Sequence, residues 1–157
     1  ANRAVANLCA FVRATGRRFG LNMISAVSAR GDFRFMLHEG SVTAKVFRTF
    51  LQRLMAGAKQ PVFLVVDGHP IHKAKLVSEY VAEQEGRLKL IVLPPYSPQL
   101  NPDEQVWGYL KTRVAKQLPQ NKDDLKARVL AVLRRIQKLP TLVQSFFRHP
   151  DCQYALG

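Results

Sequence analysis

The sequence predicts an α/β domain with a mixed sheet, and two patterns carry this prediction. The first is a pair of short apolar runs, residues 62–66 (VFLVV) and 88–93 (LKLIVL), joined by a segment with helical spacing. Continuous β-branched runs are typical of strands buried on both faces, and a strand–helix–strand connection of this length makes the two strands parallel. The second is an earlier pair of strand-like segments separated by a tight turn, which predicts an antiparallel hairpin.

The N-terminal half of the chain supplies the hairpin and one helix. Residues 1–12 show no clear period and are expected to be irregular. Residues 21–28 and 33–37 are the hairpin strands, with Asp32 as a turn former between them. Apolar positions at helical spacing predict a helix over residues 42–55.

The C-terminal half is mostly helical. A helix over residues 71–84 connects the two parallel strands, and a second follows the proline-rich loop over residues 102–117. A basic helix over residues 122–138 and a short segment over residues 142–147 complete the chain. We therefore expect residues 1–157 to form a single domain, with residues 118–157 as a C-terminal helical extension.

The charge of the chain indicates a polyanionic partner. There are 24 Lys and Arg residues against 11 Asp and Glu, which gives a formal net charge of +13. Nucleic acid is the polyanion that this excess favours, although a basic protein with no such function is the simpler alternative. No apolar run approaches the roughly 18–20 residues of a membrane span, so no membrane partner is expected.

Two acidic residues follow the two predicted parallel strands. Asp67 ends the first run directly before Gly68, at the edge where open α/β sheets build their sites, although a turn aspartate is the alternative. Glu104 falls at the third helical position after Asn101 and Pro102, which is also the geometry of a capping box. The interpretation of each residue alone therefore stays open.

Taken together, the two acids indicate a metal site. Carboxylates that meet at one edge of a sheet repel each other unless a cation lies between them, and oxygen ligands suit Mg²⁺ or Mn²⁺. Such ions activate a water or a 3′-hydroxyl in phosphodiester chemistry, and a basic surface would hold the nucleic-acid backbone. Asp67 and Glu104 are thus candidate metal ligands of a site that acts on DNA.

The segments DGHPIH and LPPYSPQLNPDEQVWGYLK resemble the DDE transposases of the mariner-like bacterial insertion sequences, and RRFGLNMISAVSARGDFRF resembles the early hairpin of that family. The resemblance implies an RNase H-like fold, with Asp67 as the second metal-binding aspartate and Glu104 as the third acid. It also implies Mg²⁺ as cofactor with Mn²⁺ as substitute. The implied activity is nicking of double-stranded DNA at transposon ends and strand transfer to a target, in the bacterial cytoplasm at the nucleoid.

The chain departs from the family pattern at the first aspartate. The family carries that residue on a strand before the hairpin, but no Asp precedes Asp32 here, and the helix-turn-helix module of such transposases is also absent. We therefore interpret the chain as the C-terminal portion of a transposase, a catalytic domain that is incomplete at its N-terminus. The alternative is an inactive remnant that binds DNA and cuts nothing.

Further residues are weaker candidates. His72 matches a recurring histidine of the family and either assists metal or phosphate contact or orders its loop, and Asn101 is a second accessory candidate. Tyr96 is a candidate DNA contact, and Trp107 is interpreted as a core residue. Basic residues on the helices beside the two acids are candidate phosphate contacts: Lys73, Lys75, Lys111, Arg113 and Lys116. The basic helix over residues 122–138 would bind either DNA or a second copy of the chain in a homodimer.

Overall fold

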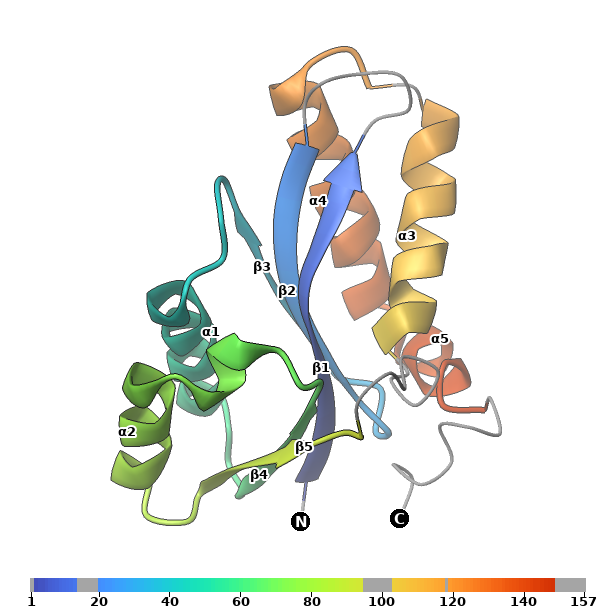
Figure 1. Cartoon of the computed structure of the whole chain (residues 1–157). Helices are drawn as coiled ribbons and strands as arrows, with labels where there is room; N and C mark the ends of the chain where they lie inside the picture. Colours follow the sequence, from blue (N-terminus) through green and yellow to red (C-terminus); the bar gives the residue numbers. More distant parts are fainter. Residues whose placement is uncertain (1, 14–19, 95–102, 118, 149–157) are drawn as a thin grey trace.

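One five-stranded sheet organises the protein, in the strand order β3-β2-β1-β4-β5 (Figure 1). The computed structural model describes residues 2–13, 20–94, 103–117 and 119–148. Strand β1 is antiparallel to β2, which is antiparallel to β3, whereas β4 and β5 run parallel to β1. The strands are β1 (Asn2–Arg13), β2 (Gly20–Ser28), β3 (Phe33–His38), β4 (Val62–Val66) and β5 (Leu88–Val92). The predicted hairpin and the predicted parallel pair are both present, so the fold class is confirmed.

Strand β1 corrects the expectation that residues 1–12 are irregular. It is the central strand, and it pairs with β2 on one side and with β4 on the other. Its sequence, NRAVANLCAFVR, lacks the β-branched run of a buried strand. Strand propensity depends on context, and this strand forms because both of its edges find partners that lie far away in the sequence.

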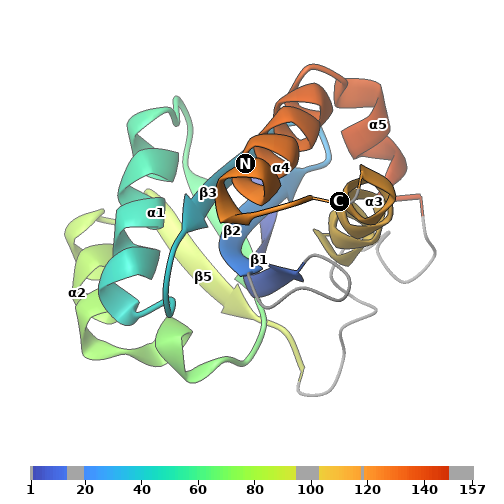
Figure 2. The same ribbon diagram turned by 90° about the horizontal axis from the view of Figure 1, so that it is seen from above.

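Helices cover both faces of the sheet (Figure 2). Helices α1 (Ala44–Ala56) and α2 (Lys75–Glu83) lie on one face, and α3 (Asp103–Gln117), α4 (Lys122–Gln137) and α5 (Pro140–Ser145) lie on the other. The single helix expected over residues 71–84 is wrong, because a 3-10 helix, η1 (Pro70–Lys73), comes first and the extended backbone of Ala74 separates it from α2. Among the helices of the described residues, none is long and apolar enough to cross a membrane.

The alternation of side chains along the strands divides the apolar residues into two cores. In β4, Val65 joins the core beneath α3, α4 and α5, whereas Val62, Leu64 and Val66 join the core beneath α1 and α2. Trp107 of α3 is 2% exposed in the first of these cores, which confirms its interpretation as a core residue. The alternation also fixes which face each residue beyond the end of β4 approaches.

Candidate active site

Asp67 stands at the carboxyl end of β4, in the interior of the sheet between β1 and β5. The parallel pairing of β4 with both neighbours, Val5 with Val65 and Val66 with Val92, carries the sheet up to this point. Because Asp67 lies two positions beyond Val65, strand alternation places it on the face that α3 covers. Its side chain is 46% exposed. The position is the one predicted from the sequence.

Backbone and histidine groups orient the carboxylate of Asp67. Oδ1 accepts a hydrogen bond from the backbone N–H of His69 at 3.0 Å. Nδ1 of His72 lies 2.8 Å from the backbone carbonyl oxygen of Asp67 and 3.3 Å from Oδ1. A carbonyl and an ionised carboxylate are both acceptors, so Nδ1 of His72 carries the proton and donates. These contacts connect the turn after β4 to the carboxylate of Asp67.

These contacts favour the charged form of Asp67. The hydrogen bond from His72 lowers the pKa of the Asp67 carboxyl below its ordinary value, the N–H of His69 acts in the same direction, and partial burial opposes them. Among the described residues, Oδ2 of Asp67 has no hydrogen-bond donor. A half-exposed, ionised carboxylate with a free oxygen fits a hard divalent cation such as Mg²⁺.

His72 is held inside the fold. It is 5% exposed, and its ring lies against that of Phe47 of α1 with 4.8 Å between the centroids. Nε2 is buried and has no hydrogen-bond partner in the described part of the chain. This geometry favours the interpretation that His72 orders the loop around Asp67 over a direct contact with phosphate.

The second predicted ligand, Glu104, is the second residue of α3. Its side chain lies outside the described residues, as do Asn101 and Tyr96 entirely. Helix α3 lies against β1 and β2, on the face that position 67 approaches (Figure 1). Within the described residues, no group of three or more His, Cys, Asp or Glu side chains is placed to hold a metal ion. The pairing of Asp67 with Glu104 therefore stays a prediction.

Sequence reasoning missed the neighbour of Asp67 on β1. The parallel register pairs Val5 with Val65, and two further residues along each strand bring Asn7 level with Asp67. Asn7 is also paired with Ser25 of β2, a buried polar residue. No residue of β1 is acidic. The strand beside Asp67 is therefore present, but it carries an amide residue at this level.

The comparison with protein families decides which family the chain belongs to. A family model described as "DDE superfamily endonuclease" matches residues 7–126, which is most of the chain. The chain belongs to the DDE superfamily of endonucleases. The matched residues of this DDE domain include Asn7, Asp67, His72 and Glu104. The expectation of a DDE-type enzyme family is confirmed.

Solved structures share the fold of the DDE domain. A chain of the simian T-cell lymphotropic virus intasome matches with a TM-score of 0.64 and 12% identity, over 82% of this chain and 47% of that one. The Mos1 transposase catalytic domain with raltegravir and Mg gives a TM-score of 0.58 and 12% identity, over 91% of this chain and 82% of that one. The catalytic core of HTLV-2 integrase in complex with magnesium gives a TM-score of 0.60 and 10% identity, over 87% of this chain and 83% of that one. These matches confirm the RNase H-like catalytic-core fold. No curated protein sequence gives a significant match.

The predicted phosphate contacts all lie on the surface of the DDE domain. They are Lys73 at the end of η1, Lys75 on α2, and Lys111, Arg113 and Lys116 on α3. Lys75 forms an ion pair with Glu79 at 3.8 Å, and the Arg113 guanidinium lies 4.0 Å from the ring centroid of Tyr109. Exposed cations on η1 and α3 therefore follow Asp67 and Glu104 in the chain, and their role as phosphate contacts stays a prediction.

Proposed function

We propose that this DDE domain carries out metal-dependent cleavage and strand transfer on double-stranded DNA at transposon ends. Asp67 and Glu104 would be its carboxylate ligands, with Mg²⁺ as cofactor and Mn²⁺ as substitute. The observation that carries the proposal is the ionised, half-exposed carboxylate of Asp67 at the carboxyl end of a central parallel strand. Structures with the same fold support the metal, since the HTLV-2 integrase core is in complex with magnesium and the Mos1 domain with Mn.

The residues of the chain prepare the site for such a cation. The cation would supply Lewis-acid stabilisation and an activated water or hydroxyl. His72 and the N–H of His69 hold one oxygen of Asp67, which leaves the other for the ion. Phe47 fixes the ring of His72 from behind, so the orientation of the carboxylate depends on the α1–α2 core.

The charge of the chain supports DNA as the partner. A net charge of +13 favours a polyanion, and the exposed cations on η1 and α3 would bind backbone phosphates. We place the protein at the bacterial nucleoid for the same reason. Helix α4 exposes a further group of cations, and it would contact DNA or a second copy of the chain in a homodimer: Lys122, Lys126, Arg134 and Arg135.

A second candidate function is DNA binding without cleavage. The observation that favours it is Asn7, because β1 places a neutral residue level with Asp67 and has no acid anywhere along its length. An amide contributes no negative charge to a cation site, so the site would hold Mg²⁺ more weakly than three carboxylates would.

A plasmid-nicking assay with Mn²⁺ separates the two candidates. We expect nicking by the unchanged chain and a loss of at least about 100-fold in Asp67→Asn, because losing a ligand costs more than the roughly 10–100-fold typical of outer-shell partners. Asp123→Asn is the matched control, since Asp123 is an exposed residue of the first turn of α4. DNA binding without any nicking would favour the second candidate. Nicking that persists in Asp67→Asn would reject the assignment of Asp67.

A further inference from the structure

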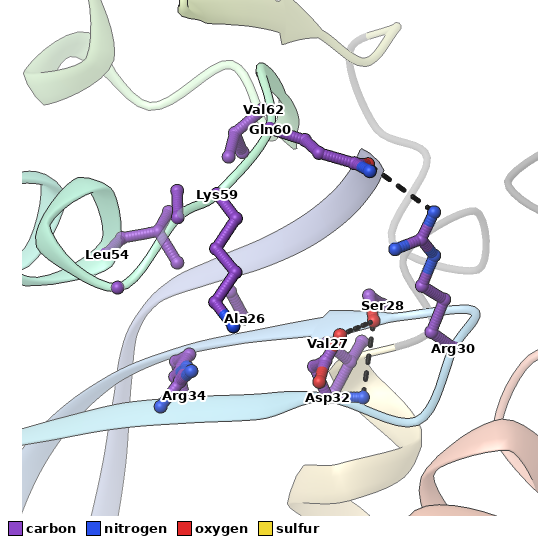
Figure 3. Close-up of a pocket in the computed structure, with 12 residues that line it drawn as sticks. Ala26, Val27, Ser28, Arg30, Asp32, Arg34, Leu54, Lys59, Gln60 and Val62 are labelled. Atoms are coloured by element: carbon purple, nitrogen blue, oxygen red, sulfur yellow. Dashed lines mark hydrogen bonds between the residues drawn. The ribbon is translucent and has the colours of Figure 1, made fainter. Parts of the chain in front are cut away.

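A pocket of about 250 Å³ lies beside the β2–β3 hairpin (Figure 3). One wall is the β2–β3 turn, and the other is the C-terminal end of α1 with the segment that leads into β4. Apolar side chains form part of the lining, among them Ala26, Leu54 and Val62. The two walls come from segments that are far apart in the sequence. The proposed cleavage chemistry assigns no role to the pocket.

Three cations surround this pocket. Arg30 and Arg34 come from the β2–β3 hairpin, and Lys59 comes from the opposite wall and extends toward Arg34 (Figure 3). Arg34 also reaches across, because its Nη2 lies 3.6 Å from where a Cβ on Gly57 would be. None of the three cations forms an ion pair with another described residue.

The polar neighbours do not neutralise these cations. Asp32 is the acid of the pocket, and its Oδ2 accepts a hydrogen bond from Ser28 Oγ at 2.9 Å within the turn. Nη2 of Arg30 donates to Oε1 of Gln60, a neutral group, at 3.5 Å. Three positive charges against one negative charge around a single hollow favour an anion there.

Size and position limit what the anion is. Ligand pockets usually measure about 300–1,000 Å³, so this one suits a single phosphate-sized group rather than a whole cofactor. The sheet itself separates the pocket from the acid, because Ala26, Leu54 and Val62 of the lining belong to the core under α1 and α2, whereas Asp67 approaches the face that α3 covers. The pocket is therefore not a part of the metal site.

We propose that this pocket binds a backbone phosphate of a DNA strand that passes the β2–β3 hairpin. Arg34 and Lys59 hold the phosphate from the two walls, and Arg30 closes the side near Gln60. Guanidinium groups match the oxygens of a phosphate, and such contacts position a duplex without reading its sequence. The contact would set how the DNA lies on the domain, and it requires neither metal nor Asp67.

The test measures DNA affinity in the absence of divalent metal over a series of salt concentrations. In the double variant Arg34→Gln/Lys59→Gln we expect affinity to fall at least tenfold, on the order expected for lost charged hydrogen bonds. The plot of the logarithm of the association constant against the logarithm of the salt concentration should become shallower. The magnitude of its slope should decrease by about 1–2, or about 1 per phosphate-binding cation. The matched control is Lys45→Gln/Arg53→Gln, which removes two exposed cations of α1 that do not line the pocket. If the control loses as much affinity and slope, only net charge matters and the proposal is overturned.

Two further measurements distinguish a DNA contact from a site for a free anion and from a loss of folding. Inorganic phosphate that binds the unchanged chain but not the double variant, with no difference in DNA binding, would mean that the pocket holds a free anion, and this would overturn the DNA contact. The single variant Arg34→Lys keeps the positive charge, so its DNA binding should keep most of the salt dependence of the unchanged chain. Thermal unfolding checks that each variant is folded. DNA binding without metal tests the pocket and nicking with Mn²⁺ tests the cleavage proposal, so failure of the one and failure of the other are distinguishable.

Discussion

Single residues around Asp67 show how a turn is made into a candidate metal site. Nδ1–H of His72 donates to the backbone carbonyl of Asp67 at 2.8 Å and lies 3.3 Å from its carboxylate. His72, whose ring makes both contacts, is 5% exposed, and the ring packs against Phe47. Rotation of His72 away from Asp67 would thus disturb the α1–α2 core as well as the loop. The orientation of the Asp67 carboxylate thus depends on packing beneath α1 and α2, although the carboxylate itself approaches the face that α3 covers.

Asn7 gives the sharpest prediction at this scale. The change Asn7→Asp would add a carboxylate level with Asp67, and we expect the affinity for Mn²⁺ to rise at least about tenfold, because hard cations are bound more tightly as carboxylate ligands are added. Without metal the two carboxylates repel, so the melting temperature should fall in EDTA and recover with Mn²⁺. Calorimetric titration and thermal unfolding measure these effects.

The control for Asn7→Asp is Asn121→Asp. Asn121 caps α4 through a side-chain oxygen, and aspartate serves equally well as an N-cap, so this change adds the same charge without adding a ligand. A double-mutant cycle with Asp67→Asn should remove most of the gain from Asn7→Asp, because the two positions would share the ion. Equal Mn²⁺ affinity in the unchanged chain and in Asn7→Asp would show that the two positions do not share a site.

Among the elements, the β2–β3 turn contains a glycine at which any side chain would be strained. Gly31 has φ of +98°, and a Cβ there would lie 2.7 Å from the carbonyl oxygen of Pro140 at the start of α5. Gln144 of α5 donates to the carbonyl of Arg30 at 3.1 Å, which holds the helix on the turn. The turn and α5 are therefore in direct backbone contact.

Two glycine-to-alanine changes should shift the free energy of unfolding in opposite directions. Gly31→Ala forces a side chain into the left-handed region and against Pro140, so we expect the free energy of unfolding to fall by more than about 1 kcal/mol. Gly108→Ala in α3 meets nothing within 4 Å and should raise it by up to about 1 kcal/mol through helix propensity. Urea unfolding of both variants measures the difference. A Gly31→Ala variant as stable as the unchanged chain would contradict the contact with α5.

The start of α4 gives a pH prediction. The Asp124 carboxylate accepts from the backbone N–H of Gln120 and from Nε of Arg128, each at 2.9 Å, and these bonds lower its pKa below the ordinary 3.8, the first more than the second. Because the folded pKa is the lower one, the stabilisation is fully present above pH 3.8 and is lost as pH falls through the folded value.

The change Asp124→Asn tests this dependence. We expect the variant to melt at a lower temperature than the unchanged chain at neutral pH, and the gap to close as the solution is acidified below the folded pKa of Asp124. Asp123→Asn, which alters the neighbouring exposed acid, is the control and should show a smaller gap. A gap for Asp124→Asn that stays constant from neutral to acid pH would mean that the charge of Asp124 contributes nothing.

For the whole molecule, sequence patterns predict what is local and miss what is built by distant segments. The β4–β5 pair and the hairpin are predictable because each strand carries its own pattern of apolar residues and turns. Strand β1 is not predictable in this way, since its small and polar residues become a strand only between β2 and β4. The position of Asp67 follows from the end of an apolar run. Its neighbour Asn7 and the basic pocket depend on register and tertiary contact, which no local pattern records.

The sheet couples two cores that would otherwise be independent. Leu64 and Val65 are consecutive residues of β4, yet Leu64 belongs to the core under α1 and α2, and Val65 to the core under α3, α4 and α5. A strand that leaves the sheet removes side chains from both cores at once. We therefore expect the domain to unfold in one cooperative transition, as small single domains usually do.

Two substitutions on opposite faces test this cooperativity. Leu64→Ala and Leu133→Ala each truncate a fully buried side chain, one in each core, and each should lower the free energy of unfolding by about 2–5 kcal/mol. Trp107, the single tryptophan, reports on the α3–α5 core through its fluorescence, while far-ultraviolet circular dichroism reports on all elements. Since β4 contributes to both cores, Leu64→Ala should shift the Trp107 transition as far as the dichroism transition, although Leu64 lies on the opposite face. If Leu64→Ala leaves the Trp107 transition where it was and the dichroism curve shows two steps, the two faces of the sheet unfold separately. In that case the contact of His72 with Asp67 could be lost without disturbing the core beneath α3.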